Sequence, residues 1–137
     1  MASGTVQKTE TIPIKNSSDV VVVRQRVRVL AIEMKFSLVE QTKIVTAASE
    51  LGRNTLEHGR GGSLELAVIT NGARRGICLR FTDQGPGIPD VALALKDGYT
   101  SGSGMGLGLG GAKRLMNEFE IDTKPGSGTT VTTIRWK

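Results

Sequence analysis

Residues 100–108 read T-S-G-S-G-M-G-L-G, and they run directly into an apolar helical pattern that includes Leu109 and Ala112. Six of the 18 glycines in the chain fall between residues 102 and 111. Backbone N–H groups left bare by glycines at the start of a helix form an anion site that suits phosphate. A flexible linker has a similar composition, and the stretch matches neither a Walker loop nor a dinucleotide-binding motif. Alone, it indicates a phosphate site only weakly.

Hydrophobic periodicity and turn residues predict the elements on either side of this stretch. Side-chain oxygens in the cluster 16–19 suit a helix N-cap, and Ser37 with Glu40 has the form of a capping box. Pro13 fits an edge strand, where a missing N–H is tolerated. The expected elements are a strand at 9–15, helices at 20–34 and 37–59, a strand pair at 63–70 and 77–83, a short helix after Pro89, a helix carrying Leu109 to Phe119, and strands at 120–124 and 129–136.

This order of elements predicts the fold class. Helices collected on one face of a mixed, largely antiparallel sheet make a two-layer α+β sandwich. With 137 residues the chain is expected to form a single domain, residues 1–137.

Composition and charge exclude several classes of protein. No stretch approaches the ~18 apolar residues of a membrane span, the N-terminus lacks the pattern of a secretory signal, and the one cysteine, Cys78, cannot form an internal disulfide. We therefore expect a cytoplasmic protein with no membrane partner. The net charge of +5 comes from 18 basic residues scattered among 13 acidic ones, with 4% aromatic residues. No basic stripe or stacking platform follows, so no nucleic-acid partner is expected.

Glu50 and Asn54 stand four residues apart and share one face of the predicted helix at 37–59. An amide oxygen at Asn54 suits a divalent cation, and a carboxylate at Glu50 suits the alignment or deprotonation of a nucleophile. A solvated helix face is the other interpretation of the same pair. The residues alone leave both open.

Asp83 ends a predicted strand and is followed by Gly85 and Gly87 in the sequence D-Q-G-P-G-I. These residue types are typical of a plain turn. The alternative is a base-recognition site, in which the Asp83 carboxylate accepts a hydrogen bond from an exocyclic amine and the glycines let the backbone approach a flat ring.

The order of these motifs is more specific than any one of them. Glu50-x-x-x-Asn54, Asp83-x-Gly85-x-Gly87, a Gly-x-Gly-x-Gly at 104–108 and Gly-x-Gly-Thr at 126–129 resemble the N box and glycine boxes of the GHKL nucleotide-binding superfamily. The resemblance covers the chain from about residue 37 onward. It implies a Bergerat-type ATP-binding fold with a lid made from the glycine-rich loop.

Within that superfamily, the motifs look most like the anti-sigma-factor-type serine/threonine kinases, and among them the stressosome switch kinases. The resemblance implies ATP and Mg²⁺ as ligands, Glu50 as catalytic base, Asn54 as ligand of Mg²⁺ and phosphate, and Asp83 as adenine reader. It leaves the roles of Arg53, His58 and Lys113 undecided. The further nucleotide-binding residues that it implies are Gly85, Gly87 and Thr129 at the adenine, and Gly104, Met105, Gly106, Leu107 and Gly108 at the phosphates.

The resemblance also implies the partners. The phosphate acceptor is expected to be a Ser or Thr of a STAS-domain protein of the stressosome, after which the kinase leaves to activate a partner phosphatase. A nucleotide-dependent binding module with slow or incidental catalysis is the alternative, and a non-enzymatic α+β domain is a third.

Overall fold

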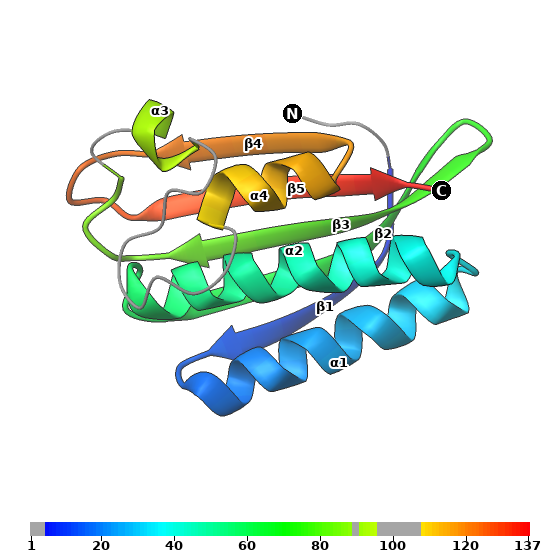
Figure 1. Cartoon of the computed structure of the whole chain (residues 1–137), viewed down its shortest axis with the longest axis horizontal. Coiled ribbons are helices and arrows are strands. Elements are labelled where there is room, and N and C mark those ends of the chain that lie inside the picture. Colours follow the sequence, from blue (N-terminus) through cyan, green and yellow to red (C-terminus); the bar gives the residue numbers. More distant parts are fainter. Residues whose placement is uncertain (1–4, 89–90, 96–107) are drawn as a thin grey trace.

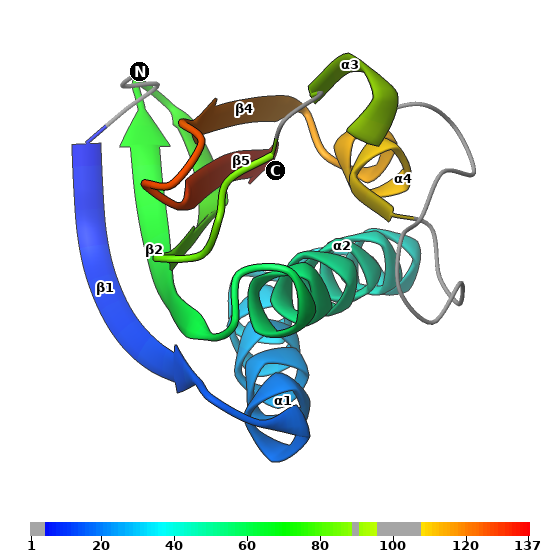
Figure 2. The same ribbon diagram turned by 90° about the vertical axis from the view of Figure 1, so that its left-hand side faces the viewer.

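The computed structural model describes the chain except residues 1–4, 89–90 and 96–107. For residues 93 and 94 it describes the backbone and not the side chains. Figure 1 shows helices gathered in front of a sheet, and Figure 2 shows that the sheet curves around them. The elements are β1 (Thr5–Ile14), α1 (Ser17–Glu33), α2 (Leu38–Glu57), β2 (Gly62–Asn71), β3 (Arg74–Asp83), α3 (Val91–Ala94), α4 (Gly108–Leu115), β4 (Glu118–Thr123) and β5 (Thr129–Trp136).

The five strands are hydrogen-bonded in the order β1-β2-β3-β5-β4, and every described pairing is antiparallel. The sheet is therefore more uniform than the mixed sheet expected from the sequence. The two-layer α+β architecture itself is confirmed. Pro13 lies in the edge strand β1 opposite Ser63, as its missing N–H predicts.

Both long helices begin directly after capping residues indicated by the sequence, although α1 starts three residues before the expected residue 20. The Asn16 side chain accepts a hydrogen bond from the Asp19 N–H at 3.0 Å. Ser37 and Glu40 form the complete capping box, with reciprocal bonds of 3.1 and 3.2 Å. These contacts satisfy N–H groups that have no partner inside the helix.

The core lies between the helices and one face of the sheet. Its fully buried side chains include Val23 and Val27 from α1, Ile44 and Leu51 from α2, and Phe81 from β3. These are the positions at which the helical and strand periods predict apolar residues, so the same packing that forms the core fixes α2 and β3 beside each other.

A second, smaller cluster occupies the opposite face of the sheet. Ala67, Ile69, Ile134 and Trp136 are buried there, and Cys78 packs against them. Burial raises the pKa of the Cys78 thiol to about 11, so the thiol stays protonated at neutral pH. Among the described helices, none is long and apolar enough to cross a membrane.

Several predicted boundaries differ from the structure: β1 begins at Thr5 and not at 9, α1 at Ser17 and not at 20, and β3 at Arg74 and not at 77. One difference also changes the type of element. The helix expected to carry Leu109 to Phe119 ends at Leu115, and Phe119 lies in β4. The Asn117 N–H donates to the Ile134 carbonyl at 2.9 Å, and the Asn117 side chain accepts from the Trp136 N–H at 2.6 Å. Hydrogen bonding to β5 therefore begins at Asn117, one residue before β4, although Phe119 keeps a helical spacing from Leu115.

Candidate active site

Glu50 connects α2 to the first residue of α4. Its side chain is buried, with 10% of its surface exposed, and its Oε1 accepts a hydrogen bond from the Gly108 N–H at 3.1 Å. Its Oε2 forms an ion pair with Arg53, one turn further along α2, at 3.2 Å. The carboxylate thus stands at the N-terminal end of α4, where partial positive charge collects. Arg53, undecided from the sequence, contacts Glu50.

Asn54 lies one turn after Glu50 and is half-buried. Its backbone carbonyl accepts hydrogen bonds from the N–H groups of His58 and Gly59, at 2.9 and 3.1 Å, which ends α2. Within the described part of the chain, its side-chain amide has no hydrogen-bond partner, so its oxygen can serve a ligand. His58 is the exposed C-cap of α2.

Asp83 is the last residue of β3, and its two carboxylate oxygens differ. Oδ1 accepts hydrogen bonds from the Gly85 N–H at 2.9 Å and from the Thr129 N–H at 3.2 Å. These bonds fix the orientation of the carboxylate. In the resolved surroundings no hydrogen bond reaches Oδ2, which is on the side of Gly59.

The end of α2 and the end of β3 touch through two glycines. A Cβ on Gly59 would overlap the side chain of Asp83, and a Cβ on Gly85 would lie 2.8 Å from the Gly59 Cα. The space that Gly85 leaves is filled by Gly59 in this structure. The close approach brings Asp83 to the helix that carries Glu50 and Asn54.

A threonine hydroxyl joins the turn after Asp83 to the β4–β5 hairpin. The Thr123 Oγ1 accepts from the Ile88 N–H at 2.9 Å, donates to the Gly128 carbonyl at 3.2 Å, and lies 2.8 Å from the Thr129 Oγ1. Gly87 has a φ of +82° and lies against the Lys124 carbonyl, a position that only glycine occupies without strain. These contacts hold together the turn after Asp83, the end of β4 and the start of β5.

The structure therefore connects the site residues through α2: Glu50 contacts Gly108 at the start of α4, and the end of α2 after Asn54 contacts Asp83, which binds Gly85 and Thr129. Gly104, Met105, Gly106 and Leu107, and with them most of the expected lid, lie outside the described residues. Lys113 is exposed in the last turn of α4, the end opposite to Gly108.

Two contributors were missed from the sequence: the contact of Gly59 with Asp83 and the hydroxyl of Thr123. The ion pair of Arg53 with Glu50 answers a question that the sequence left open. The position of Thr123 had a signal, because the hairpin at 120–136 places it opposite Thr129. The Gly59 contact joins two segments distant in sequence and had none.

The donor set fits a magnesium ion that is held mostly by phosphate. A hard cation takes oxygen ligands, and Mg²⁺ uses one or two protein oxygens together with phosphate and water. The Asn54 amide oxygen can supply one. The described residues contain no group of three His, Cys, Asp or Glu side chains arranged to hold a metal.

The fold and the site motifs define a class of protein. The family of histidine kinase-, DNA gyrase B- and HSP90-like ATPases matches residues 39–137, and the chain belongs to it. The family expected from the order of the motifs is thereby confirmed.

Within the family, the chain is 38% identical to the serine/threonine-protein kinase RsbT of Bacillus subtilis over 125 residues, which are 91% of this chain and 94% of that protein. It is 28% identical to the anti-sigma F factor of Thermoanaerobacter over 114 residues, 79% of this chain and 78% of that protein.

Solved structures share the fold. The crystal structure of the RsbU and RsbW domains of a Mycobacterium tuberculosis protein superimposes with a TM-score of 0.62 at 21% identity, covering 96% of this chain and 33% of that one. The SiaB-SiaC complex from Pseudomonas aeruginosa gives a TM-score of 0.56 at 14% identity, covering 98% and 92%.

Proposed function

We propose that this chain transfers the γ-phosphoryl group of ATP to a Ser or Thr hydroxyl of a STAS-domain protein, and then binds and activates a partner phosphatase. Family membership and the 38% identity to RsbT make the chain an ATP-dependent serine/threonine kinase of a sigma-factor regulatory switch. The acceptor protein and the phosphatase are the proposed part. The observation that carries the proposal is the Glu50 carboxylate at the first N–H of α4, one turn from Asn54.

Asp83 is proposed to read the adenine. Its Oδ1 is taken by two backbone N–H groups, which leaves Oδ2 to accept from the exocyclic amine of the base. The turn after Asp83 supports this role, because the hydroxyl of Thr123 ties it to Thr129. Gly85 and Gly87 shape the same side by letting the backbone pass closely.

The phosphates are proposed to bind at the start of α4. The N–H groups of a helix N-terminus attract anions, and Gly104, Gly106 and Gly108 alternate along the chain that leads to it. Asn54 would hold Mg²⁺ through its amide oxygen. When bound, the ion neutralises charge that develops on the phosphates.

Glu50 is proposed to accept the proton of the acceptor hydroxyl. The hydroxyl oxygen bonds to the γ-phosphorus as the bond from phosphorus to the β–γ bridging oxygen breaks, and ADP leaves. Arg53 and the Gly108 N–H orient the carboxylate for this step.

A binding module that depends on nucleotide is a second candidate. It is favoured by the similarity to a protein named anti-sigma F factor. Here partner capture would be the main output and phosphoryl transfer incidental.

A transfer assay tests the proposal. The purified chain is incubated with γ-labelled ATP, Mg²⁺ and a STAS-domain protein from the same genome, and a STAS protein with its Ser and Thr acceptors changed to Ala serves as control. We expect label on Ser or Thr of the intact substrate only. Binding of the STAS protein without label transfer would favour the binding module.

A further inference from the structure

Helix α1 is apolar on two faces. One face, with Val20, Val23, Val27, Leu30 and Ala31, is buried in the core. The opposite side carries four large apolar side chains, and these are exposed by 40% to 53% of their surface: Val21, Val22, Val29 and Ile32. Apolar side chains on a second, exposed face of a helix offer area that a partner can cover. The second face of α1 is uncovered in the described structure.

Two arginines border this apolar strip. Arg24 and Arg28 are four residues apart, so they lie on the same side of the helix, and both are exposed. The outer face of α1 consists of Val21, Val22, Arg24, Arg28, Val29 and Ile32, with the exposed polar Gln25 between the valines. Arg26 is not part of it, because it makes a two-pronged ion pair with Glu10 of β1, with N–O distances of 2.9 and 3.0 Å.

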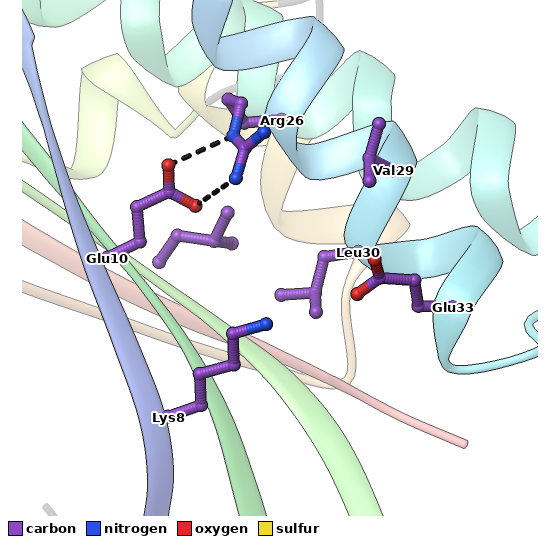
Figure 3. Close-up of a pocket in the computed structure, with 7 residues that line it drawn as sticks. Lys8, Glu10, Arg26, Val29, Leu30 and Glu33 are labelled. Carbon is purple, nitrogen blue, oxygen red and sulfur yellow. Dashed lines mark hydrogen bonds and ion pairs between the residues drawn. The ribbon is translucent and has the colours of Figure 1, made fainter.

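The pocket beside Arg26 is not a second ligand site. Figure 3 shows Arg26 and Glu10 pointing toward each other across it, with Leu30 between the helix and the sheet. The pocket measures about 80 Å³ and is lined by two acidic and two basic side chains, among them Lys8 and Glu33. Its charges balance, and its size suits a few water molecules. It marks the boundary of the outer face toward β1.

The outer face of α1 is separated from the active site by α2. Figures 1 and 2 both place α1 and α4 on opposite sides of α2, and α2 packs against both. A phosphate acceptor must bring its hydroxyl to Glu50, which lies on the α4 side of α2. A partner bound to the outer face would therefore leave Glu50 accessible to a substrate.

We propose that the outer face of α1 docks the partner phosphatase through an amphipathic helix whose apolar stripe is bordered by Asp or Glu side chains. This inference rests on the proposed function for the identity of the partner. The apolar strip supplies area to bury, and Arg24 with Arg28 supplies charge that an acidic border complements.

A second copy of the chain is a poorer occupant. Arg24 and Arg28 lie on either side of the middle of Ser17–Glu33. Two copies of α1 packed antiparallel about a two-fold axis would bring both pairs of arginines together, and like charges that face each other oppose association.

The test uses two double variants on the outer face. Val21→Ser with Ile32→Ser removes apolar area, and Arg24→Glu with Arg28→Glu reverses the charge. Arg75→Glu with Arg80→Glu, two exposed arginines of β3, changes the net charge equally and is the matched control. Circular dichroism and thermal unfolding check that each variant folds.

The probe is the purified phosphatase of the same genome, read out by calorimetric binding and by its activation. We expect both outer-face variants to lose roughly 10-fold or more in affinity, with the control unchanged. ATP affinity and label transfer to the STAS protein should stay at the wild-type level in all three.

Unchanged phosphatase binding in both outer-face variants would overturn the surface and leave the proposed function intact. If the wild type neither binds nor activates the phosphatase, this inference and the phosphatase half of the proposed function both fail, while the transfer assay judges the kinase half. A wild-type dimer that Val21→Ser with Ile32→Ser dissociates would assign the face to a second copy. Binding to anionic lipid vesicles that both variants lose would assign it to a membrane. Either result overturns the proposal.

Discussion

At the residue scale, the two carboxylate oxygens of Asp83 differ: Oδ1 accepts hydrogen bonds from the protein backbone, and Oδ2 accepts none from the described residues. Because Oδ1 accepts from two backbone N–H groups, an asparagine at this position would keep its own oxygen there. Its NH₂ group would then stand where Oδ2 is now. The change from aspartate to asparagine therefore reverses hydrogen-bond polarity on the ligand side alone.

Asp83→Asn is expected to weaken ATP binding strongly while the fold persists, because a donor would face the adenine amine. Isothermal titration calorimetry measures the affinity, and thermal unfolding checks the fold. Asp122→Asn, at an exposed aspartate of β4, is the matched control and should bind ATP normally. Wild-type affinity in Asp83→Asn would remove Asp83 from adenine recognition.

Gly59→Ala is expected to weaken ATP binding by roughly 10-fold or more, because the new methyl group overlaps Asp83 and must displace it. Gly52→Ala adds the same methyl group in α2, where it meets the Val20 Cγ1 at an ordinary 3.6 Å. That control should bind ATP normally and be about 0.4–1 kcal/mol more stable. Equal ATP affinities in the two variants would show that the Gly59 contact is irrelevant to the site.

At the element scale, local signals fixed where helices begin better than where one of them ends. Asn16, Ser37 and Glu40 act within four residues of their partners, so the sequence alone predicts the capping box of α2 and narrows the cap of α1 to residues 16–19. The end of α4 depends on the pairing of β4 with β5. The helical spacing of Phe119 carries no information about that pairing. Apolar spacing could not distinguish the two outcomes.

The capping box gives the start of α2 a pH dependence. The hydrogen bond from the Ser37 N–H lowers the pKa of the Glu40 carboxyl, with a smaller contribution from the Arg135 charge. Since the folded pKa lies below the ordinary value of 4.5, the stabilisation is present above that pH and is lost as the pH falls through the folded pKa.

Glu40→Gln is therefore expected to lower the free energy of unfolding at pH 7 by about 0.3–1 kcal/mol, the scale of a charge at a helix N-terminus. The deficit should shrink toward zero below the folded pKa of Glu40. Urea unfolding at pH 7 and pH 3 measures this difference in the free energy of unfolding. Glu120→Gln, at an exposed glutamate of β4, is the control. A deficit that is the same at both pH values would contradict the ionic contribution.

At the scale of the whole molecule, the site is assembled from the ends of four elements. The residue types and order of Glu50, Asn54 and Asp83 could be read from the sequence, because each belongs to a short motif. The contacts that unite them could not, since Gly59 meets Asp83 and Gly108 meets Glu50 only after the helices pack on the sheet. Arg53 was ambiguous for the same reason.

The pair Glu50 and Asn54 separates catalysis from nucleotide binding. Glu50→Gln keeps an oxygen for the Gly108 N–H but turns an NH₂ group toward Arg53 and cannot accept a proton as a carboxylate does. Asn54→Ala removes the amide oxygen proposed for Mg²⁺. Glu50→Gln should therefore impair phosphoryl transfer, whereas Asn54→Ala should impair nucleotide binding.

The most direct measurement is single-turnover transfer of label from γ-labelled ATP to the STAS-domain substrate, made beside calorimetric ATP binding for the wild type, Glu50→Gln and Asn54→Ala. We expect transfer by the wild type, a fall of roughly 10²-fold or more in Glu50→Gln with ATP affinity retained, and loss of Mg²⁺-dependent ATP binding in Asn54→Ala. Wild-type transfer by Glu50→Gln would contradict the account.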